Sequence, residues 1–130
     1  MKSLLLFVTL LCVVTLSSSV VGSKAANAGK RQKATTQFNQ PVSLQGVILK
    51  GEYLFIHDDA AMARGEACTF VYKGDSPVKE NLVASFHCIP AERTKVKSFT
   101  VRTQQVAGVE ELREFQFSGD TEAHVVPGAK

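Results

Sequence analysis

The chain has 130 residues, a formal net charge of +3 and 45% hydrophobic residues, with three cysteines and no tryptophan. This length fits one domain and is too short for a Rossmann or TIM-barrel architecture. The positive charge is concentrated near the N-terminus, because residues 37–130 contain 10 basic and 12 acidic side chains. A dense basic face on the folded part is therefore not expected, and no nucleic-acid partner is predicted.

Residues 1–22 have the three parts of a secretory signal peptide. Lys2 provides a basic start, residues 4–14 are almost continuously apolar, and small residues follow up to Gly22. Cleavage is expected between residues 22 and 28. The apolar run is too short to cross about 30 Å of hydrocarbon comfortably, and Leu11 before Cys12 does not fit a lipoprotein signal. The sequence thus predicts an exported protein, periplasmic or secreted, with no membrane span after processing.

The segment that follows the predicted signal peptide is polar and basic. It carries Lys24, Lys30, Arg31 and Lys33, with no acidic residue before residue 37. Residues 23–38 are therefore predicted to be a flexible basic tail, with contact to anionic envelope material as the alternative. Residues 39–130 are expected to form a single β domain.

From Gln40 onward, short apolar runs and alternation of apolar with polar residues favour β-strands. Glycine, proline and aspartate separate these runs. Strands are expected at residues 42–44, 47–50, 52–57, 67–73, 81–88, 97–103, 112–117 and 123–126. The pattern predicts an all-β fold, either a small antiparallel sandwich or a partly closed barrel. One short helical turn is expected at residues 58–64, capped by Asp58 or Asp59.

The predicted core is built mainly from phenylalanine. The four consecutive apolar residues from Tyr53 to Ile56 indicate a central strand that is covered on both faces. The other side chains expected to point inward are Phe70, Tyr72, Val83 or Phe86, Phe99, Val101, Phe115 and Phe117.

Cys68 and Cys88 are the cysteines that remain after the predicted processing. If the two strands around them form a hairpin in which Phe70 lies opposite Phe86, Cys68 lies opposite Cys88 on the same side of the sheet. In an oxidising compartment this arrangement predicts a disulfide bond. The alternative is a catalytic or metal-binding thiol, which lacks the support of a C-x-x-C spacing.

The sequence contains three histidines, His57, His87 and His124, which lie far apart along the chain. No local metal-binding spacing joins them, so surface or turn positions are the simpler interpretation. If a metal site exists, His57 and His124 are the better candidates, because alternation places His87 on the opposite face from Cys88. Glu122 is an acidic residue that is available to the same site.

Asp58 and Asp59 form a candidate carboxylate pair for acid–base chemistry. Adjacent residues on a strand point to opposite sides, so capping of the next helical turn is the simpler role. Arg64 and Glu66 are placed to organise the same loop by charge. No hydrolase or nucleotide-binding motif is present, so no catalytic residue and no cofactor are predicted.

Four segments of the chain resemble a known group of proteins. They are Gly51 to Asp59, Met62 to Cys68, residues 83–88 and residues 115–124. With its H-D-D and M-A-R-G-x-x-C elements, the chain resembles a group of small secreted bacterial proteins of uncharacterised function. This resemblance implies a bacterial exported protein and transfers no catalytic residue. It favours a single surface site formed by His57, Asp58, Asp59, Arg64 and His124.

The leading functional hypothesis is an exported, disulfide-bonded β domain that binds or scaffolds a partner in the cell envelope or outside the cell. The alternative is a metal-binding protein or metal-dependent enzyme that uses His57, His124 and the Asp58–Asp59 loop. A carbohydrate-binding module is the weakest candidate, because only Tyr53 and Tyr72 are available to stack on a sugar in a chain without tryptophan. The sequence identifies neither the partner nor the oligomeric state.

Overall fold

The computed structural model describes residues 30–128, so the predicted signal peptide at residues 1–22, with Cys12, lies outside the described part. Strands dominate the described residues and confirm the all-β prediction. The elements are β1 (Arg31–Leu44), β2 (Val47–Asp58), α1 (Asp59–Ala63), β3 (Thr69–Lys73), the 3-10 turn η2 (Lys79–Asn81), β4 (Leu82–Phe86), β5 (Ile89–Glu92), β6 (Thr100–Val106), β7 (Val109–Gln116) and β8 (Glu122–Val125).

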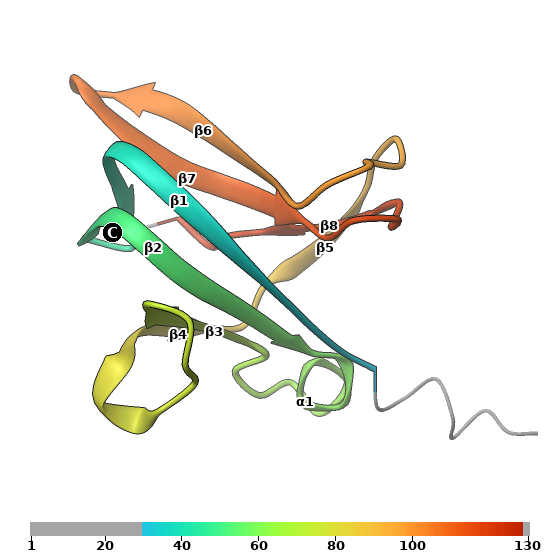
Figure 1. The fold of residues 1–130 in the computed structure, drawn as a ribbon. Coiled ribbons are helices and arrows are strands. Elements are labelled where there is room, and N and C mark those ends of the chain that lie inside the picture. The colour runs from blue at the N-terminus through green and yellow to red at the C-terminus, as the bar shows by residue number, and fades with distance from the viewer. Residues whose placement is uncertain (1–29, 129–130) are drawn as a thin grey trace, which may run out of the picture.

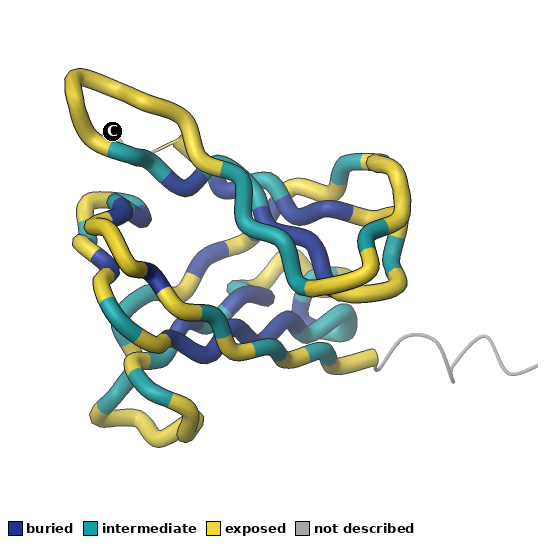
Figure 2. Tube along the Cα trace, turned by 45° about the horizontal axis from the view of Figure 1, so that its top comes forward, coloured by how far each residue is buried: buried dark blue, intermediate teal, exposed yellow. Residues whose placement is uncertain are grey.

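The eight strands form one curled sheet that resembles half of a barrel (Figure 1). Its order is β4-β3-β2-β1-β7-β8-β5, and β6 pairs with the other edge of β7. The junction of β1 with β7 is parallel and short, from Val42–Glu110 to Ser43–Glu111. Curling brings the strands β2 to β4 opposite β5 to β8, and the buried residues line the space between these two walls (Figure 2). The two ends of this order, β4 and β5, follow each other in the chain and are joined by His87 and Cys88.

Strand β1 starts earlier than the sequence analysis predicted. It pairs with β2 from Arg31–Asp58 through to Leu44–Val47, apart from a register shift between Phe38 and Val42. The interpretation of residues 31–38 as a flexible tail is therefore wrong. The alternating half-buried side chains of this segment include Gln32 and Ala34, which are too polar or too small to give an apolar alternation. Backbone pairing with the strongly apolar β2 holds the segment in the sheet.

Strand β2 is central, as predicted from its apolar run. It lies between β1 and β3, and all four residues from Tyr53 to Ile56 are buried. The inner face continues through Phe55, whose ring centroid lies 5.4 Å from those of Phe99 and Phe115. His57 follows on this same inner face, because side chains two residues apart on a strand point to the same side.

The register between β3 and β4 differs by one residue from the predicted one. Phe70 pairs with Ser85, and Phe86 pairs with Thr69. Thr69 and Val71 are consequently the fully buried residues of β3, while Phe70 and Tyr72 are half-buried. Since both faces of β3 carry large or apolar side chains, alternation alone does not decide which face turns inward.

The other core predictions are largely confirmed. Phe86, Phe115 and Phe117 are buried, and Phe99 and Val101 pack against the core from partly buried positions. No helix within residues 30–128 is both long enough and apolar enough to span a membrane.

The short helix α1 also follows the prediction. Asp58 is its N-cap, and the carboxylate accepts hydrogen bonds from the backbone N–H groups of Ala60 and Ala61. This cap fixes the path of the chain directly after His57.

Two hairpins close with two-residue turns in which both residues have positive φ. The turn between β1 and β2 contains Gln45 (φ 47°) and Gly46 (φ 84°). The turn between β6 and β7 contains Ala107 (φ 50°) and Gly108 (φ 79°). These values match type I′ turns, whose twist suits a hairpin. Gln45 and Ala107 adopt a conformation that side chains with a Cβ disfavour.

Candidate metal centre

Two histidines from opposite walls of the half-barrel meet in the core. His57 comes from the end of β2 and His124 from β8, and their ring centroids are 4.0 Å apart. His57 is fully buried and His124 is 1% exposed. His124 also stacks on Phe115, its cross-strand neighbour on β7, at a centroid distance of 5.1 Å. The interpretation of these two histidines as surface or turn residues is therefore wrong.

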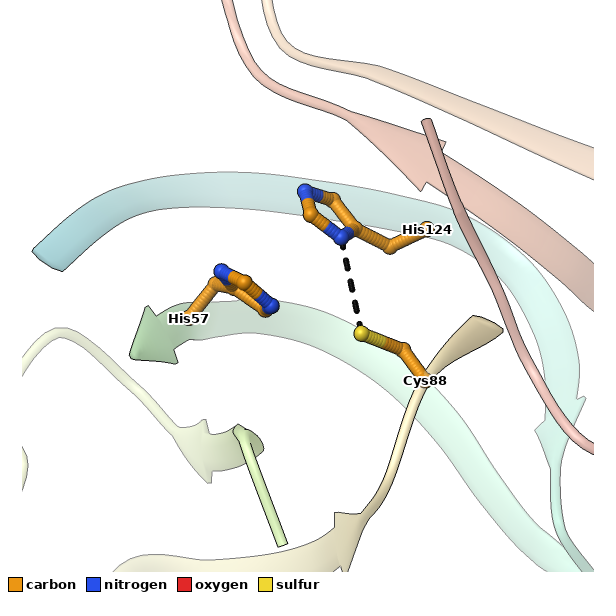
Figure 3. A group of neighbouring side chains, drawn as sticks. All are labelled: His57, Cys88 and His124. Carbon is orange, nitrogen blue, oxygen red and sulfur yellow. Dashed lines mark hydrogen bonds between the residues drawn. The ribbon is translucent and has the colours of Figure 1, made fainter. Parts of the chain in front are cut away.

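Cys88 completes this cluster from the connection between β4 and β5. Its thiol is fully buried, and Sγ lies 3.5 Å from Nδ1 of His124. Candidate ligand atoms of His57, Cys88 and His124 all lie within 4.8 Å of one another. Figure 3 shows both imidazole rings next to the sulfur of Cys88. Because this connection joins β4 of one wall to β5 of the other, it carries the thiol into the space between the two walls.

Several ring nitrogens of the cluster have no hydrogen-bond partner among the described residues. These atoms are Nδ1 and Nε2 of His57 and Nε2 of His124. A buried polar group without a partner costs about 1–3 kcal/mol, and native structures contain few of them. The Nε2 atoms of His57 and His124 therefore require an explanation, whereas Nδ1 of His57 has a carboxylate nearby. Imidazole nitrogens and thiolate sulfur are the usual ligands of zinc and copper.

A carboxylate stands behind His57. Oδ1 of Asp59 lies 3.1 Å from Nδ1 of His57, although the angle is not that of an aligned hydrogen bond. Asp58, in contrast, is used as the helix cap. The two carboxylates thus have separate roles, as expected for adjacent residues. A carboxylate beside one nitrogen of a histidine is the common way to orient the other nitrogen toward a metal.

Burial keeps both histidines neutral at pH 7. It lowers the pKa of His124 to about 4, and the neighbouring His57 adds to this effect. The pKa of His57 is also lowered by burial, against the opposing charge of Asp59. Neutral imidazole is the form that offers a lone pair to a metal.

The thiol of Cys88 is protonated in the absence of a metal. Burial, together with the neighbouring Cys68, raises the pKa of Cys88 to about 12. A metal ion that binds this sulfur must therefore displace its proton.

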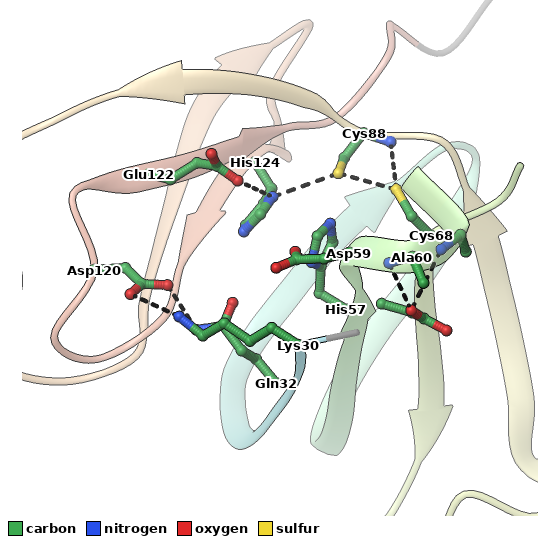
Figure 4. A network of polar contacts seen from close by, with 12 residues as sticks. Lys30, Gln32, His57, Asp59, Ala60, Cys68, Cys88, Asp120, Glu122 and His124 are labelled. Carbon is green, nitrogen blue, oxygen red and sulfur yellow. Dashed lines mark hydrogen bonds and ion pairs between the residues drawn. The ribbon is translucent and has the colours of Figure 1, made fainter. Parts of the chain in front are cut away.

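A polar pocket borders the histidine pair. Lys30, Gln32, Asp59, Asp120, Thr121 and Glu122 line this pocket. Asp59 contacts His57, and Oε1 of Glu122 lies 3.9 Å from Nδ1 of His124 (Figure 4). Asp120 accepts hydrogen bonds from Gln32 and Lys30. With three carboxylates and one lysine, the pocket places a net negative charge next to the histidine pair, which favours the approach of a cation.

The predicted disulfide between Cys68 and Cys88 is not formed. Their Sγ atoms lie 3.2 Å apart, beyond the S–S bond length of about 2.05 Å, and both thiols are free and buried. The predicted proximity is correct, although the predicted register is not. Cys68 lies just before β3, where its backbone N–H donates to the carbonyl of Phe86, and this contact carries it to the side of Cys88.

The single surface site suggested by the resemblance is also not formed as expected. His57, Asp58, Asp59 and His124 lie near the end of β2, but the two histidines are buried. Arg64 pairs with Glu66 at 3.1 Å on the surface, in agreement with the loop role expected for that pair. His87 is exposed, and its Nδ1 lies 2.8 Å from the carbonyl oxygen of Glu66.

Sequence reasoning missed the association of Cys88 with His124. It also missed Gln116, a fully buried residue whose amide donates to the carbonyls of Thr94 and Asp120 and accepts from Arg102. Gln116 thereby holds the turn that carries Asp120. One signal was available for His57, because it continues the alternation of Tyr53 and Phe55, which were predicted to be buried.

Comparisons with known proteins give no assignment. No protein-family model matches the chain, and neither curated proteins nor solved structures provide a match.

Proposed function

We propose that this protein binds a thiophilic transition metal ion, Zn²⁺ or Cu⁺, through Cys88, His57 and His124. The observation that supports this proposal is the convergence of three buried ligand side chains from separate elements, with candidate ligand atoms within 4.8 Å of one another. The Nε2 atoms of His57 and His124 have no hydrogen-bond partner within residues 30–128, so each ring has a buried polar atom that a bound ion could explain.

The type of ion follows from the type of ligand. A thiolate is a soft ligand that favours Cu⁺ and Zn²⁺, and imidazole suits the same ions. The hard ions Mg²⁺ and Ca²⁺ prefer a set of oxygen ligands instead. Three protein ligands leave one coordination position, which a water molecule or a carboxylate from the adjoining pocket can fill.

The burial of the cluster favours retention of an ion over turnover of a substrate. None of the three ligands is more than 1% exposed. Asp59, which is half-buried behind His57, acts as the orienting group in this proposal. The closed setting therefore favours a metal-binding protein over a metal-dependent enzyme.

The predicted signal peptide supports export, so we place this metal binding in the cell envelope or outside the cell. The envelope partner expected for the β domain remains part of the same proposal. Metal binding is the more specific role, because converging histidines are expected in a metal-binding protein and are not needed in a protein that only scaffolds a partner.

The test uses the purified protein under reducing conditions, after removal of metals with a chelator. Zn²⁺ and Cu⁺ are titrated separately, and bound metal is counted by elemental analysis after gel filtration. The variants Cys88→Ser and His124→Leu each remove one ligand, whereas His87→Ala removes an exposed histidine outside the cluster and serves as the matched control. Circular dichroism confirms that each variant is folded.

The proposal expects one ion per chain for the wild type and for His87→Ala, and loss of at least about a hundredfold in affinity for the two ligand variants. Cobalt(II) in place of zinc should give a thiolate charge-transfer band that depends on Cys88. Equal binding by the wild type and by both ligand variants would overturn the assignment, as would the absence of binding by the reduced wild type.

A further inference from the structure

The sulfur of Cys88 lies between two different partners. On one side is Nδ1 of His124, at 3.5 Å from Sγ. On the other side is Sγ of Cys68, at 3.2 Å (Figure 4). Both contacts are buried.

Cys68 does not belong to the candidate ligand group, which consists of His57, Cys88 and His124. Its sulfur lies 3.9 Å from the carbonyl oxygen of Phe86 and 4.0 Å from Nδ1 of His87. Cys68 therefore sits next to the ligand group without completing it, and its position calls for a separate role.

We infer that Cys88 is a shared sulfur, which either binds the metal ion together with His57 and His124 or forms a disulfide with Cys68, so that oxidation of the thiol pair releases the ion. This inference rests on the metal binding proposed above. It assigns to Cys68 the role of a redox partner for the ligand Cys88, and it makes the metal-bound and disulfide states mutually exclusive.

The backbone already holds the two cysteines in position for this bond. The backbone N–H of Cys68 donates to Phe86 at 3.1 Å, and that of Cys88 donates to Sγ of Cys68 at 3.3 Å. Closing the sulfurs from 3.2 Å to a bond of about 2.05 Å needs a movement of roughly 1 Å, within the reach of side-chain rotation. A sulfur committed to this bond no longer has the thiolate charge that binds the ion.

The oxidant is a small-molecule disulfide, and the reaction balances in two exchange steps. In the first step, the sulfur of Cys68 attacks the reagent, forms a mixed disulfide and releases one reagent thiol, which takes the proton of Cys68. In the second step, the thiolate of Cys88 leaves the metal, attacks the sulfur of Cys68 and expels the second reagent thiolate. The two cysteines lose two electrons, the reagent gains them, and the metal ion departs.

The surroundings of Cys68 favour it as the first site of exchange. Its sulfur lies beside His87, which is exposed, and the preceding residues Arg64 to Glu66 are exposed as well. Cys68 itself is fully buried, as is Cys88. A small reagent would therefore reach Cys68 through local opening of the short irregular segment before β3, which carries these exposed residues.

The experiment starts from reduced protein loaded with one Zn²⁺ and adds oxidised glutathione. A chromogenic chelator reports released zinc, and mass spectrometry of the intact, non-reduced chain reports the bond. The matched variant is Cys68→Ser, which retains all three ligands. The wild type should release its zinc at the same rate as its mass falls by two hydrogens, which reports formation of the disulfide. A thiol reductant should restore zinc binding. Cys68→Ser should bind zinc as tightly and release it at least tenfold more slowly.

Two results would overturn this inference. One is retention of zinc by wild-type protein whose Cys68–Cys88 bond has formed, and the other is equal release from the wild type and Cys68→Ser. Failure of the reduced wild type to bind zinc at all is a distinct outcome, because it rejects the metal site itself before any oxidant is added.

Discussion

The imidazole rings of His57 and His124, which come from opposite walls of the half-barrel, lie against each other in the protein core, with their centroids 4.0 Å apart and their planes tilted by 34°. Each ring has an Nε2 atom without a hydrogen-bond partner among the residues that the structure describes. A proton added to either ring would place a charge in a buried site beside the other ring. We therefore expect metal binding, stability in acid and the redox state of Cys88 all to depend on this one cluster.

The metal-free protein should lose stability in mild acid because of His124. Its pKa is about 4 when folded, lowered by burial and by His57, and about 6.5 when unfolded. The unfolded state therefore binds more protons below pH 6.5, so the free energy of unfolding is fully present above that pH and falls until about pH 4. The shift corresponds to a loss of about 3 kcal/mol. Urea denaturation between pH 4 and pH 7.5 measures this loss.

Two other charged groups also act on the pKa of His124, so the experiment needs a variant without this histidine as its control. Asp120 acts to raise its pKa, and Lys30 acts to lower it. The variant His124→Leu removes the titrating ring and should flatten the pH dependence between pH 4 and 6.5, apart from the contribution of His57. An equally steep dependence in this variant would show that His124 is not the responsible group.

Replacement of a ligand should stabilise the metal-free protein. In His124→Leu, an apolar side chain of similar volume replaces a ring with an unpartnered buried nitrogen, which should raise the free energy of unfolding at pH 7 by about 1 kcal/mol. The same variant should lose the stabilisation that Zn²⁺ gives the wild type. Thermal unfolding with and without zinc measures both effects. A variant that is less stable without metal and still stabilised by zinc would contradict the account.

Loss of the α1 cap should weaken the segment next to the site. Asp58→Ala removes the carboxylate that accepts from Ala60 and Ala61, and should lower the free energy of unfolding by about 1 kcal/mol. Asp58→Asn retains an acceptor at the same position and serves as the control. In chemical denaturation, the alanine variant should have the lowest free energy of unfolding of the three proteins. Equal stability of all three would show that the Asp58 cap does not stabilise the fold.

The turn between β6 and β7 offers a stabilising substitution. Ala107 is exposed and has a φ of 50°, a conformation that asparagine tolerates better than alanine. Ala107→Asn should therefore raise the free energy of unfolding by about 0.5 kcal/mol, and Ala107→Val should lower it by about 1 kcal/mol. Because the side chain is exposed, packing does not confound the comparison. The opposite order in thermal unfolding would reject the type I′ assignment.

The sequence predicted the parts of this fold that local patterns specify. The apolar run from Tyr53 to Ile56 marked the central strand, and Asp58 marked the start of the helix. The first half of β1 could not be found in this way, because Gln32 and Ala34 leave no apolar alternation there. The register of β3 failed for the opposite reason, since Phe70 and Val71 make both of its faces apolar.

The candidate site was predicted only in part. His57 and His124 were named as the better metal candidates, and Cys68 was correctly placed near Cys88. The contact between Cys88 and His124 depends on the pairing of β5 with β8, in which Ile89 lies opposite Val125, and the contact between His57 and His124 depends on the curl of the sheet. No local spacing encodes such a contact, so the structure was needed to identify it.

The central claim is that Cys88, His57 and His124 form one metal site, and isothermal titration of reduced, metal-free protein with Zn²⁺ tests it most directly. The account predicts one ion bound per chain, with release of the proton of Cys88 that appears as a buffer-dependent binding enthalpy. Binding should disappear in Cys88→Ser and persist in His87→Ala. No binding by the wild type, or binding that Cys88→Ser leaves unchanged, would contradict it.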